Sequence, residues 1–279
     1  MSIQLHLETC GFCSAKCHFC MYDKAENRAQ TNGHMPLPIF HKIIHEAVTI
    51  PHITEIAWSG LSEPLLDPHL VERVAYAHAA RPEWLMEMYT NGVLLTPEKF
   101  EALKTAGMNC FSVSLNSINQ EQHEKIMGLK GKFDLVCANI DYAIAHKDKV
   151  AVLVKTVINH DQFTYDDGFQ FVARWGSNHF GGHGGIVNEM NWADQLDRTI
   201  RKFDPNSCCE LRALAQISVH WDGRVNLCCL DPLGKYPWGD LKTQTIREIY
   251  NSPAYVQFRE DHANNQAARH PMCAVCTRV

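Results

Sequence analysis

The sequence predicts an α/β protein: a partial (β/α)6 TIM-like barrel followed by a small C-terminal unit of a β-hairpin and helices. Six strand-like segments alternate with helix-like segments between Ile3 and Met190, and this alternation is typical of a parallel sheet. The chain after residue 205 is different, because it carries a hairpin signal at Asp222-Gly223 and short helical segments. A length of 279 residues suits one large domain plus a small one.

The expected strands of the barrel cover residues 3–8, 53–58, 84–90, 110–115, 150–158 and 184–189. The expected helices cover 36–48, 68–80, 96–107, the stretch up to about residue 146, and 165–175. The helix at 96–107 has the clearest ends, with Thr96 as N-cap, Pro97 in its first turn and Gly107 as its stop. The C-terminal unit is expected to contain two strands within 215–229 and helices at 245–251 and 254–265. In such a barrel, catalytic residues gather at the C-terminal ends of the strands.

Composition excludes several function classes. The formal net charge is −5 and no lysine- or arginine-rich run is present, which argues against binding to nucleic acid or to an anionic membrane. No apolar run of about 18 residues exists to span a bilayer, and the N-terminus does not read as a secretory signal. We therefore expect a cytoplasmic protein, in which twelve cysteines indicate metal or redox chemistry and not disulfides.

The first cysteine cluster, in "CGFCSAKCHFC" (10–20), has the spacing Cys13-x3-Cys17-x2-Cys20 and follows the first strand. Thiolates grouped in a loop suit an iron–sulfur cluster. Three ligands on a four-iron cluster leave one iron open, and an open coordination site implies chemistry. Zinc is the alternative, with Cys10 or His18 as a fourth ligand.

These residues and three further motifs resemble the radical SAM family. The motifs are "SGLSEPLLDP" (59–68), in which Ser62 replaces the usual glycine, "YTNG" (89–92) and "VSLNS" (113–117). The resemblance implies an enzyme that cleaves S-adenosylmethionine to a 5′-deoxyadenosyl radical, which then takes a hydrogen atom from a substrate. It also implies an electron donor such as flavodoxin or ferredoxin as a partner.

The resemblance assigns residues to S-adenosylmethionine by motif position. The assigned positions are Ser59, Gly60, Ser62 and Glu63 near the methionyl amino group, Ser114 and Asn116 near the ribose or carboxylate, and Val157 to Asn159 beside the adenine. The alternative for Gly60 is a turn that merely ends a strand.

The C-terminal cysteines resemble the SPASM/twitch appendage of radical SAM enzymes, through Gly223-x4-Cys228 and the terminal Cys273-x2-Cys276. This resemblance divides the chain into a barrel at 1–205 and a twitch unit at 206–279. It implies one auxiliary [4Fe–4S] cluster, and therefore two [4Fe–4S] clusters in all. The implied ligands are Cys209 (or Cys208), Cys228, Cys273 and Cys276. A structural zinc ribbon is the alternative.

Three further residues are candidates for catalysis. One cysteine of each pair, 208/209 and 228/229, is spare once its neighbour binds a cluster, so Cys229 and Cys208 are either inert packing or donors of a hydrogen atom to a substrate radical. His183 lies in the glycine-rich stretch "NHFGGHGGIVNEM" (178–190), where it is either a general base or a surface residue.

The architecture resembles dehydrogenases of the butirosin-pathway type, which oxidise an alcohol of deoxy-scyllo-inosamine. The expected reaction is therefore oxidation of an alcohol carbon of a sugar or aminocyclitol, with an electron passed to the auxiliary cluster. Epimerisation with a spare cysteine as hydrogen donor is the first alternative. Modification of a peptide is the second, and the start of the chain directly at its first strand argues against a leader-binding domain. A simple electron carrier would not need the barrel or the S-adenosylmethionine motifs.

Overall fold

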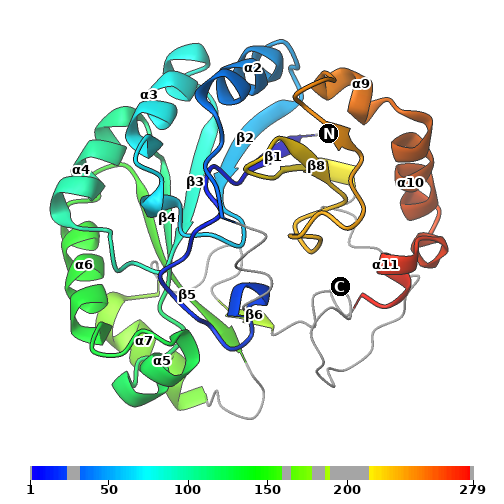
Figure 1. The fold of residues 1–279 in the computed structure, drawn as a ribbon. Coiled ribbons are helices and arrows are strands. Elements are labelled where there is room, and N and C mark those ends of the chain that lie inside the picture. The colour runs from blue at the N-terminus through cyan, green and yellow to red at the C-terminus, as the bar shows by residue number, and fades with distance from the viewer. Residues whose placement is uncertain (1, 24–31, 159–164, 178–185, 189–213, 277–279) are drawn as a thin grey trace.

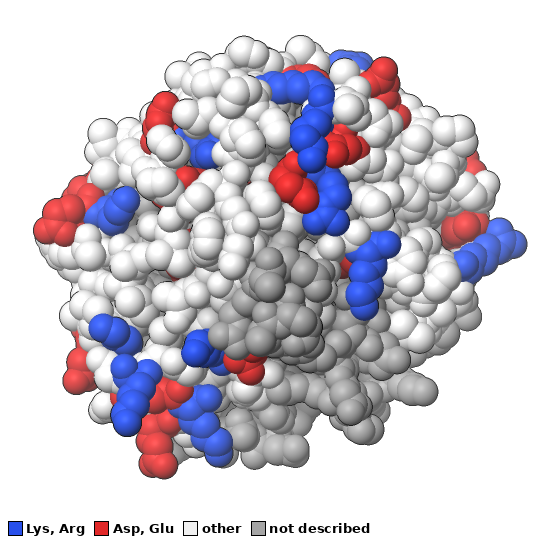
Figure 2. All heavy atoms as spheres, viewed as in Figure 1, with Lys and Arg blue, Asp and Glu red and all other residues white. Residues whose placement is uncertain are grey.

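The computed structural model describes residues 2–23, 32–158, 165–177, 186–188 and 214–276. Over these residues the chain is built on one nine-stranded sheet, in the order β6-β5-β4-β3-β2-β1-β7-β8-β9 (Figure 1). No helix in these ranges is long and apolar enough to cross a membrane. Figure 2 shows basic and acidic side chains interspersed on the viewed face.

The barrel part of the sheet consists of parallel strands, as predicted. They are β1 (Ile3–Leu7), β2 (Ile53–Trp58), β3 (Leu85–Thr90), β4 (Cys110–Ser114), β5 (Ala151–Ile158) and β6 (Ile186–Asn188). Each pairs in parallel with the next in the chain. The partial (β/α)6 barrel is confirmed, and Ile186–Asn188 of its sixth strand lies within the expected 184–189.

Helices cover the outer face of the sheet (Figure 1). They are α2 (Leu37–Val48), α3 (Leu70–Ala80), α4 (Pro97–Ala106), α5 (Gln120–Met127), α6 (Phe133–Ala145) and α7 (Tyr165–Trp175). The predicted ends of α4 are confirmed: Thr96 accepts a hydrogen bond from the backbone N–H of Lys99, and Gly107 takes a left-handed conformation with φ of 111°.

Side chains alternate between the two faces of each strand. On β1, Ile3, Leu5 and Leu7 are buried in the core beneath the helices, whereas Gln4 and His6 are only half-buried and point the other way. The same alternation on the neighbouring strands makes the outer face apolar and the inner face polar. The hydrophobic effect therefore fixes the helices outside and leaves hydrogen-bonding groups on the inside.

The predicted hairpin is present, but it extends the barrel sheet. Strand β7 (Gln216–Val219) pairs in parallel with β1, and β8 (Arg224–Asn226) pairs antiparallel with β7. A two-residue strand β9 (Gly239–Asp240) completes the sheet. The pairing satisfies the edge of β1, whose backbone groups would otherwise lack strand partners. The division at residues 205 and 206 remains a prediction.

The C-terminal helices are α9 (Ile246–Tyr250), α10 (Pro253–Ala263) and α11 (Pro271–Ala274). Trp238 stacks on Tyr255 with ring centroids 4.6 Å apart, and the Tyr255 hydroxyl donates to the carbonyl of Gln216 at 3.1 Å. Lys42 of α2 donates to the carbonyl of Leu241 at 2.6 Å. The contacts of Tyr255 hold α10 against β7, and the hydrogen bond from Lys42 joins the C-terminal segment to α2 of the barrel. Strand β9 and helix α11 were not predicted, because each is too short to show a periodic pattern.

A buried ion pair supports the outer layer. Arg73 of α3 lies 2.9 Å from Asp67, and both side chains are almost completely buried. Loss of one partner from such a pair leaves an uncompensated buried charge. Asp67→Ala should therefore lower the free energy of unfolding by about 3 to 5 kcal/mol in anaerobic urea denaturation.

The exposed pair Arg81–Glu83, at 2.8 Å, provides the matched control. Glu83→Ala should leave the urea midpoint close to that of the native chain, since the Glu83 side chain is mostly in solvent. Equal midpoints for the two variants would contradict a stabilising role for the buried pair.

Candidate active site

The loop after β1 gathers three thiols. Cys13, Cys17 and Cys20 are all partly exposed. Burial is the main cause that raises the pKa of the Cys17 thiol, and negative charge on Cys20 and Cys13 raises it further. The Cys20 N–H donates to the Cys17 carbonyl at 2.9 Å, which closes a turn between them. The structure thus brings together the three residues that the sequence predicted as cluster ligands.

The end of α5 holds this loop in place. Lys16 and His18 donate their backbone N–H groups to the carbonyls of Met127 and Ile126, at 2.9 and 3.1 Å. The sulfur of Met127 also lies 3.4 Å from the thiol of Cys17. The cysteine loop is therefore positioned by a helix that follows β4, not only by the strand it leaves.

The donor set fits an iron–sulfur cluster. Burial raises the pKa of Cys13 to about 12 and that of Cys20 to about 11, so iron binding must displace protons from these thiols. The backbone N–H of Tyr22 donates to Cys20 at 3.4 Å, and the Asn91 amide lies 4.0 Å from Cys13. N–H groups directed at cluster sulfurs tune the reduction potential.

The zinc alternative finds no fourth ligand in the described part of the chain. Cys10 is completely buried; its thiol contacts the carbonyl of Glu63 at 3.3 Å and a hydrogen bond joins it to Ser62. The Nδ1 atom of His18 lies 3.3 Å from the carbonyl of Ile126. Among the described residues, no three His, Cys, Asp or Glu side chains are grouped for a single metal ion. A four-iron cluster separates its thiolates more widely, because each binds a different iron.

The turn after β2 packs directly against the end of β1. A Cβ atom on Gly60 would lie 2.3 Å from Oε1 of Glu8, so only glycine fits without a shift. The Ser59 hydroxyl lies 2.8 Å from Nε2 of His6. Ser59 and Gly60 therefore meet the C-terminal half of β1, and their contact with S-adenosylmethionine remains a prediction.

Glu63 is tied to the end of β3. Its carboxylate accepts hydrogen bonds from the Thr90 hydroxyl and the Asn91 N–H, each at 2.7 Å, and from the Leu65 N–H at 3.2 Å. Burial raises its pKa to about 7. The carboxylate thus shapes the turn. A carboxylate has about four acceptor positions, so it can accept one further hydrogen bond, and the contact with the methionyl amino group remains a prediction.

The predicted residues after β4 and β5 are only partly placed. Ser114 is half-buried at the end of β4, and Asn116 is buried with φ of 62°. Asn116 directs its amide at the sulfur of Met127, which joins it to the cysteine loop. Val157 lies in β5, but its side chain is not described. Four further candidates lie wholly outside the described residues: Asn159, His183, Cys208 and Cys209.

The inner face of the sheet carries a charged network near these strand ends. Glu87 accepts hydrogen bonds from Tyr89 at 2.9 Å, from Lys155 at 3.2 Å and from Ser112. Lys155 is buried and stands over the ring of Tyr89, 4.3 Å from its centroid. Burial raises the pKa of Tyr89, and the charge of Glu87 and its hydrogen bond to the Tyr89 hydroxyl raise it further.

The two members of the cysteine pair 228/229 have different surroundings. Cys228 is buried, and its sulfur accepts the N–H of Leu230 at 3.4 Å. Cys229 is half-buried, and its N–H donates to the Gln216 side chain at 3.3 Å. Cys273 lies in α11 and Cys276 just after it, both partly exposed. The metal assignments of Cys228, Cys273 and Cys276 remain predictions.

Sequence reasoning missed three residues that shape the site: Glu8, Glu87 and Lys155. A signal existed for each. Glu8 is a charged residue directly between an apolar strand and the cysteine loop, and Glu87 and Lys155 are charged residues inside otherwise buried strands. Buried charges are found where they are paired or functional.

Two family models match the chain, one over each of the segments that contain the two cysteine sets. The model of the radical SAM superfamily matches residues 7–164, and that of the SPASM iron–sulfur cluster-binding domain matches residues 208–277. A tungsten-containing aldehyde ferredoxin oxidoreductase cofactor-modifying protein of Pyrococcus furiosus is 20% identical over 98% of this chain and 86% of its own length. A GTP 3′,8-cyclase of Mycobacterium sp. is 34% identical over 41% of this chain and 32% of its own length.

Solved structures share the fold. BtrN in complex with AdoMet and 2-DOIA superposes with a TM-score of 0.68 at 19% identity, covering all of this chain and 94% of that one. Streptococcus suis SuiB bound to precursor peptide SuiA superposes with a TM-score of 0.71 at 13% identity, covering 93% of this chain and 67% of that one. The chain belongs to the radical SAM superfamily and carries a SPASM domain, and it is an enzyme that uses a [4Fe–4S] cluster, S-adenosylmethionine and further iron–sulfur in its SPASM domain.

Proposed function

We propose that the protein oxidises an alcohol carbon of a sugar or aminocyclitol to a ketone. Cys13, Cys17 and Cys20 would hold the cluster that binds S-adenosylmethionine, and Cys228, Cys273, Cys276 and Cys209 the auxiliary cluster. When bound, the first cluster and S-adenosylmethionine supply a 5′-deoxyadenosyl radical, which takes a hydrogen atom from the substrate. The auxiliary cluster supplies an acceptor for the second electron. A reductant of the flavodoxin or ferredoxin type would serve the first cluster.

The observation that carries this proposal is the polar inner face of the sheet. Gln4, Ser112 and Lys155 present hydrogen-bonding groups on this face, and Gln216 joins Gln4 at 3.2 Å. These groups are paired with one another but keep further donor and acceptor positions, which the hydroxyl groups of a substrate can fill and an apolar substrate cannot. Buried Lys155, held by Glu87, would donate to a substrate oxygen.

Epimerisation is the second candidate, and the position of Cys229 favours it. Cys229 is half-buried, and its N–H donates to the Gln216 side chain, which joins Gln4 on the inner face, while its neighbour Cys228 is buried with an N–H directed at its sulfur. A half-buried thiol beside the substrate face could return a hydrogen atom to a substrate radical. Cys208 is the second donor candidate.

Peptide modification is supported by the peptide-bound relatives. Besides SuiB, native anSMEcpe with bound AdoMet and Cp18Cys peptide superposes with a TM-score of 0.70 at 14% identity. Below 25% identity, such likeness speaks for the fold, so it supports a peptide substrate less directly than the polar inner face supports a hydroxylated one.

Cluster content tests the two cysteine sets. Anaerobically reconstituted protein should contain about eight iron atoms per chain, as expected of two [4Fe–4S] clusters. The triple substitution of Cys13, Cys17 and Cys20 by Ala should leave about four. Cys137→Ala is the control, because this buried thiol lies in α6, outside both sets. Stoichiometric zinc without charge-transfer absorbance would overturn the assignment.

The turn after β2 can be tested by Gly60→Ala. The added Cβ cannot fit beside Glu8, so either the turn or the buried Glu8 side chain beneath it must move, and the affinity for S-adenosylmethionine should fall about tenfold, or about 1.4 kcal/mol. Equilibrium dialysis of the reconstituted protein measures it. Gly131→Ala controls for a strained glycine substitution away from the turn, since its φ of 68° disfavours alanine but no atom lies within 4 Å of its added Cβ. An unchanged affinity at normal iron content would remove this turn from the binding site.

Deuterium labelling separates the two candidate reactions. In D₂O, an oxidation adds no carbon-bound deuterium during catalysis, whereas return of hydrogen from an exchangeable thiol labels one carbon. We expect an unlabelled ketone, with product formation insensitive to Cys229→Ala. Mass spectrometry of products from a panel of aminocyclitols and sugars is the measurement. Deuterium that disappears with Cys229→Ala would establish epimerisation instead.

A further inference from the structure

The side chain of Glu8 packs against the turn at residues 59–63, which is the proposed binding site for S-adenosylmethionine. Its buried carboxylate accepts the N–H of Leu61 at 2.8 Å through Oε1. The same oxygen fills the space next to Gly60. The turn that begins at Ser59 therefore rests on one carboxylate at the end of β1, and its position depends on where that carboxylate is held.

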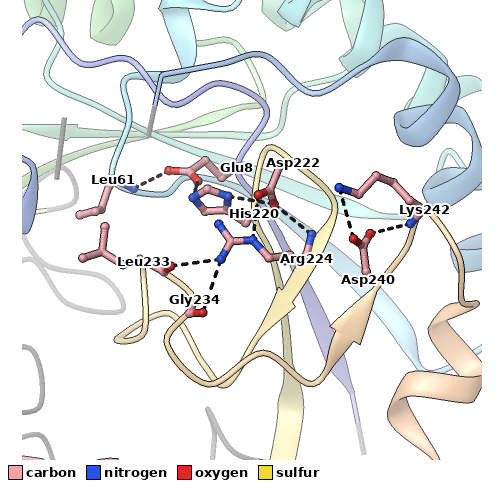
Figure 3. Close-up of polar contacts among 9 residues, drawn as sticks. All are labelled: Glu8, Leu61, His220, Asp222, Arg224, Leu233, Gly234, Asp240 and Lys242. Carbon is pink, nitrogen blue, oxygen red and sulfur yellow. Dashed lines mark hydrogen bonds and ion pairs between the residues drawn. The ribbon is translucent and has the colours of Figure 1, made fainter. Parts of the chain in front are cut away.

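The second oxygen of Glu8 is held from the C-terminal part of the chain. Nε2 of His220 lies 3.1 Å from Oε2 of Glu8, and Nδ1 of His220 lies 3.1 Å from Asp222. Arg224 in turn contacts Asp222 at 2.7 Å. Figure 3 shows these side chains directed toward one another, with Leu61 at the far end of the chain of contacts.

The sheet itself produces this arrangement. Leu7 pairs with Val219 as the last residue of the β1–β7 ladder, so Glu8 and His220 each leave the paired strands at the same level. The Glu8 N–H still donates to the Val219 carbonyl at 3.0 Å. Trp221 adds a backbone hydrogen bond to the Glu8 carboxylate. Both backbones are thus fixed where the two side chains meet.

We propose that Glu8 and His220 are positioning residues through which the hairpin that carries Cys228 fixes the S-adenosylmethionine turn. The inference rests on the proposed placement of the cofactor at residues 59–63. The imidazole is buried between two carboxyl groups, and its removal leaves the Glu8 carboxyl without the side chain that faces it, so that it can move away from Leu61. Affinity for S-adenosylmethionine then depends on a residue of the C-terminal segment.

The test compares His220→Gln, Glu8→Gln and the double variant in the reconstituted protein. Each single substitution should weaken S-adenosylmethionine binding about tenfold, and the double variant should bind no more weakly than the weaker single, because the two residues act as a unit. Equilibrium dialysis measures the affinity. The change that S-adenosylmethionine causes in the electron paramagnetic resonance spectrum of the reduced cluster should shrink in parallel.

His262→Gln is the matched control. His262 is as buried as His220, at 2% exposure, but its Nδ1 contacts only the Phe258 carbonyl within its own helix α10, at 2.8 Å. It should lose stability with no loss of S-adenosylmethionine affinity. If His220→Gln does not fold, the affinity of Glu8→Gln for S-adenosylmethionine is compared with that of His262→Gln instead.

Two results would be decisive against the inference. Affinities in His220→Gln and Glu8→Gln that match the control would remove the positioning role, and so would strictly additive losses in the double variant. Gly60→Ala separates this failure from that of the placement: weak binding in Gly60→Ala with normal binding in His220→Gln leaves the turn in place and discards only the pair.

Discussion

The pairing of β1 on both of its edges is the constraint on which the site depends. Strand β1 lies between β2 and β7, in parallel with each. Its C-terminal end therefore meets the end of β2 on one side and the end of β7 on the other. The cysteine loop, the turn at Gly60 and the hairpin before Cys228 all begin at this one edge of the sheet. Loss of the β1–β7 pairing would separate the cysteine loop from the hairpin before Cys228, and loss of the β1–β2 pairing would separate it from the turn at Gly60.

Strand alternation then divides the molecule into a stabilising side and a chemical side. Leu5 and Ile56 belong to the core beneath the helices, whereas Glu87 and Lys155 on the inner face are stabilised by each other and by hydroxyl donors. A buried charge costs too much unless it is paired, and Lys155 meets this condition through Glu87. Under the proposed function, this pair faces the substrate.

Local patterns predicted most of the fold. Capping at Thr96, strand alternation and cysteine spacing each lie within a few residues, and the structure confirms the first two. The contacts between distant segments were beyond such patterns. Nothing near Glu8 identifies His220 as its partner, and nothing in the hairpin sequence shows that β7 joins β1. A single sequence contains the residues of such a pair but not the topology that brings them together.

The pair Cys228-Cys229 shows how far that limit reaches into function. In the sequence the two thiols are equivalent, and only the Gly223-x4-Cys228 spacing favours one as a ligand. In the fold they differ: Cys228 is buried and receives an N–H at its sulfur, while Cys229 is half-buried and its N–H donates to the Gln216 side chain. Hydrogen bonds to a ligating sulfur tune a cluster, and a hydrogen donor needs contact with substrate. The doubled cysteine therefore supplies two different positions, and whether the second one takes part decides between oxidation and epimerisation.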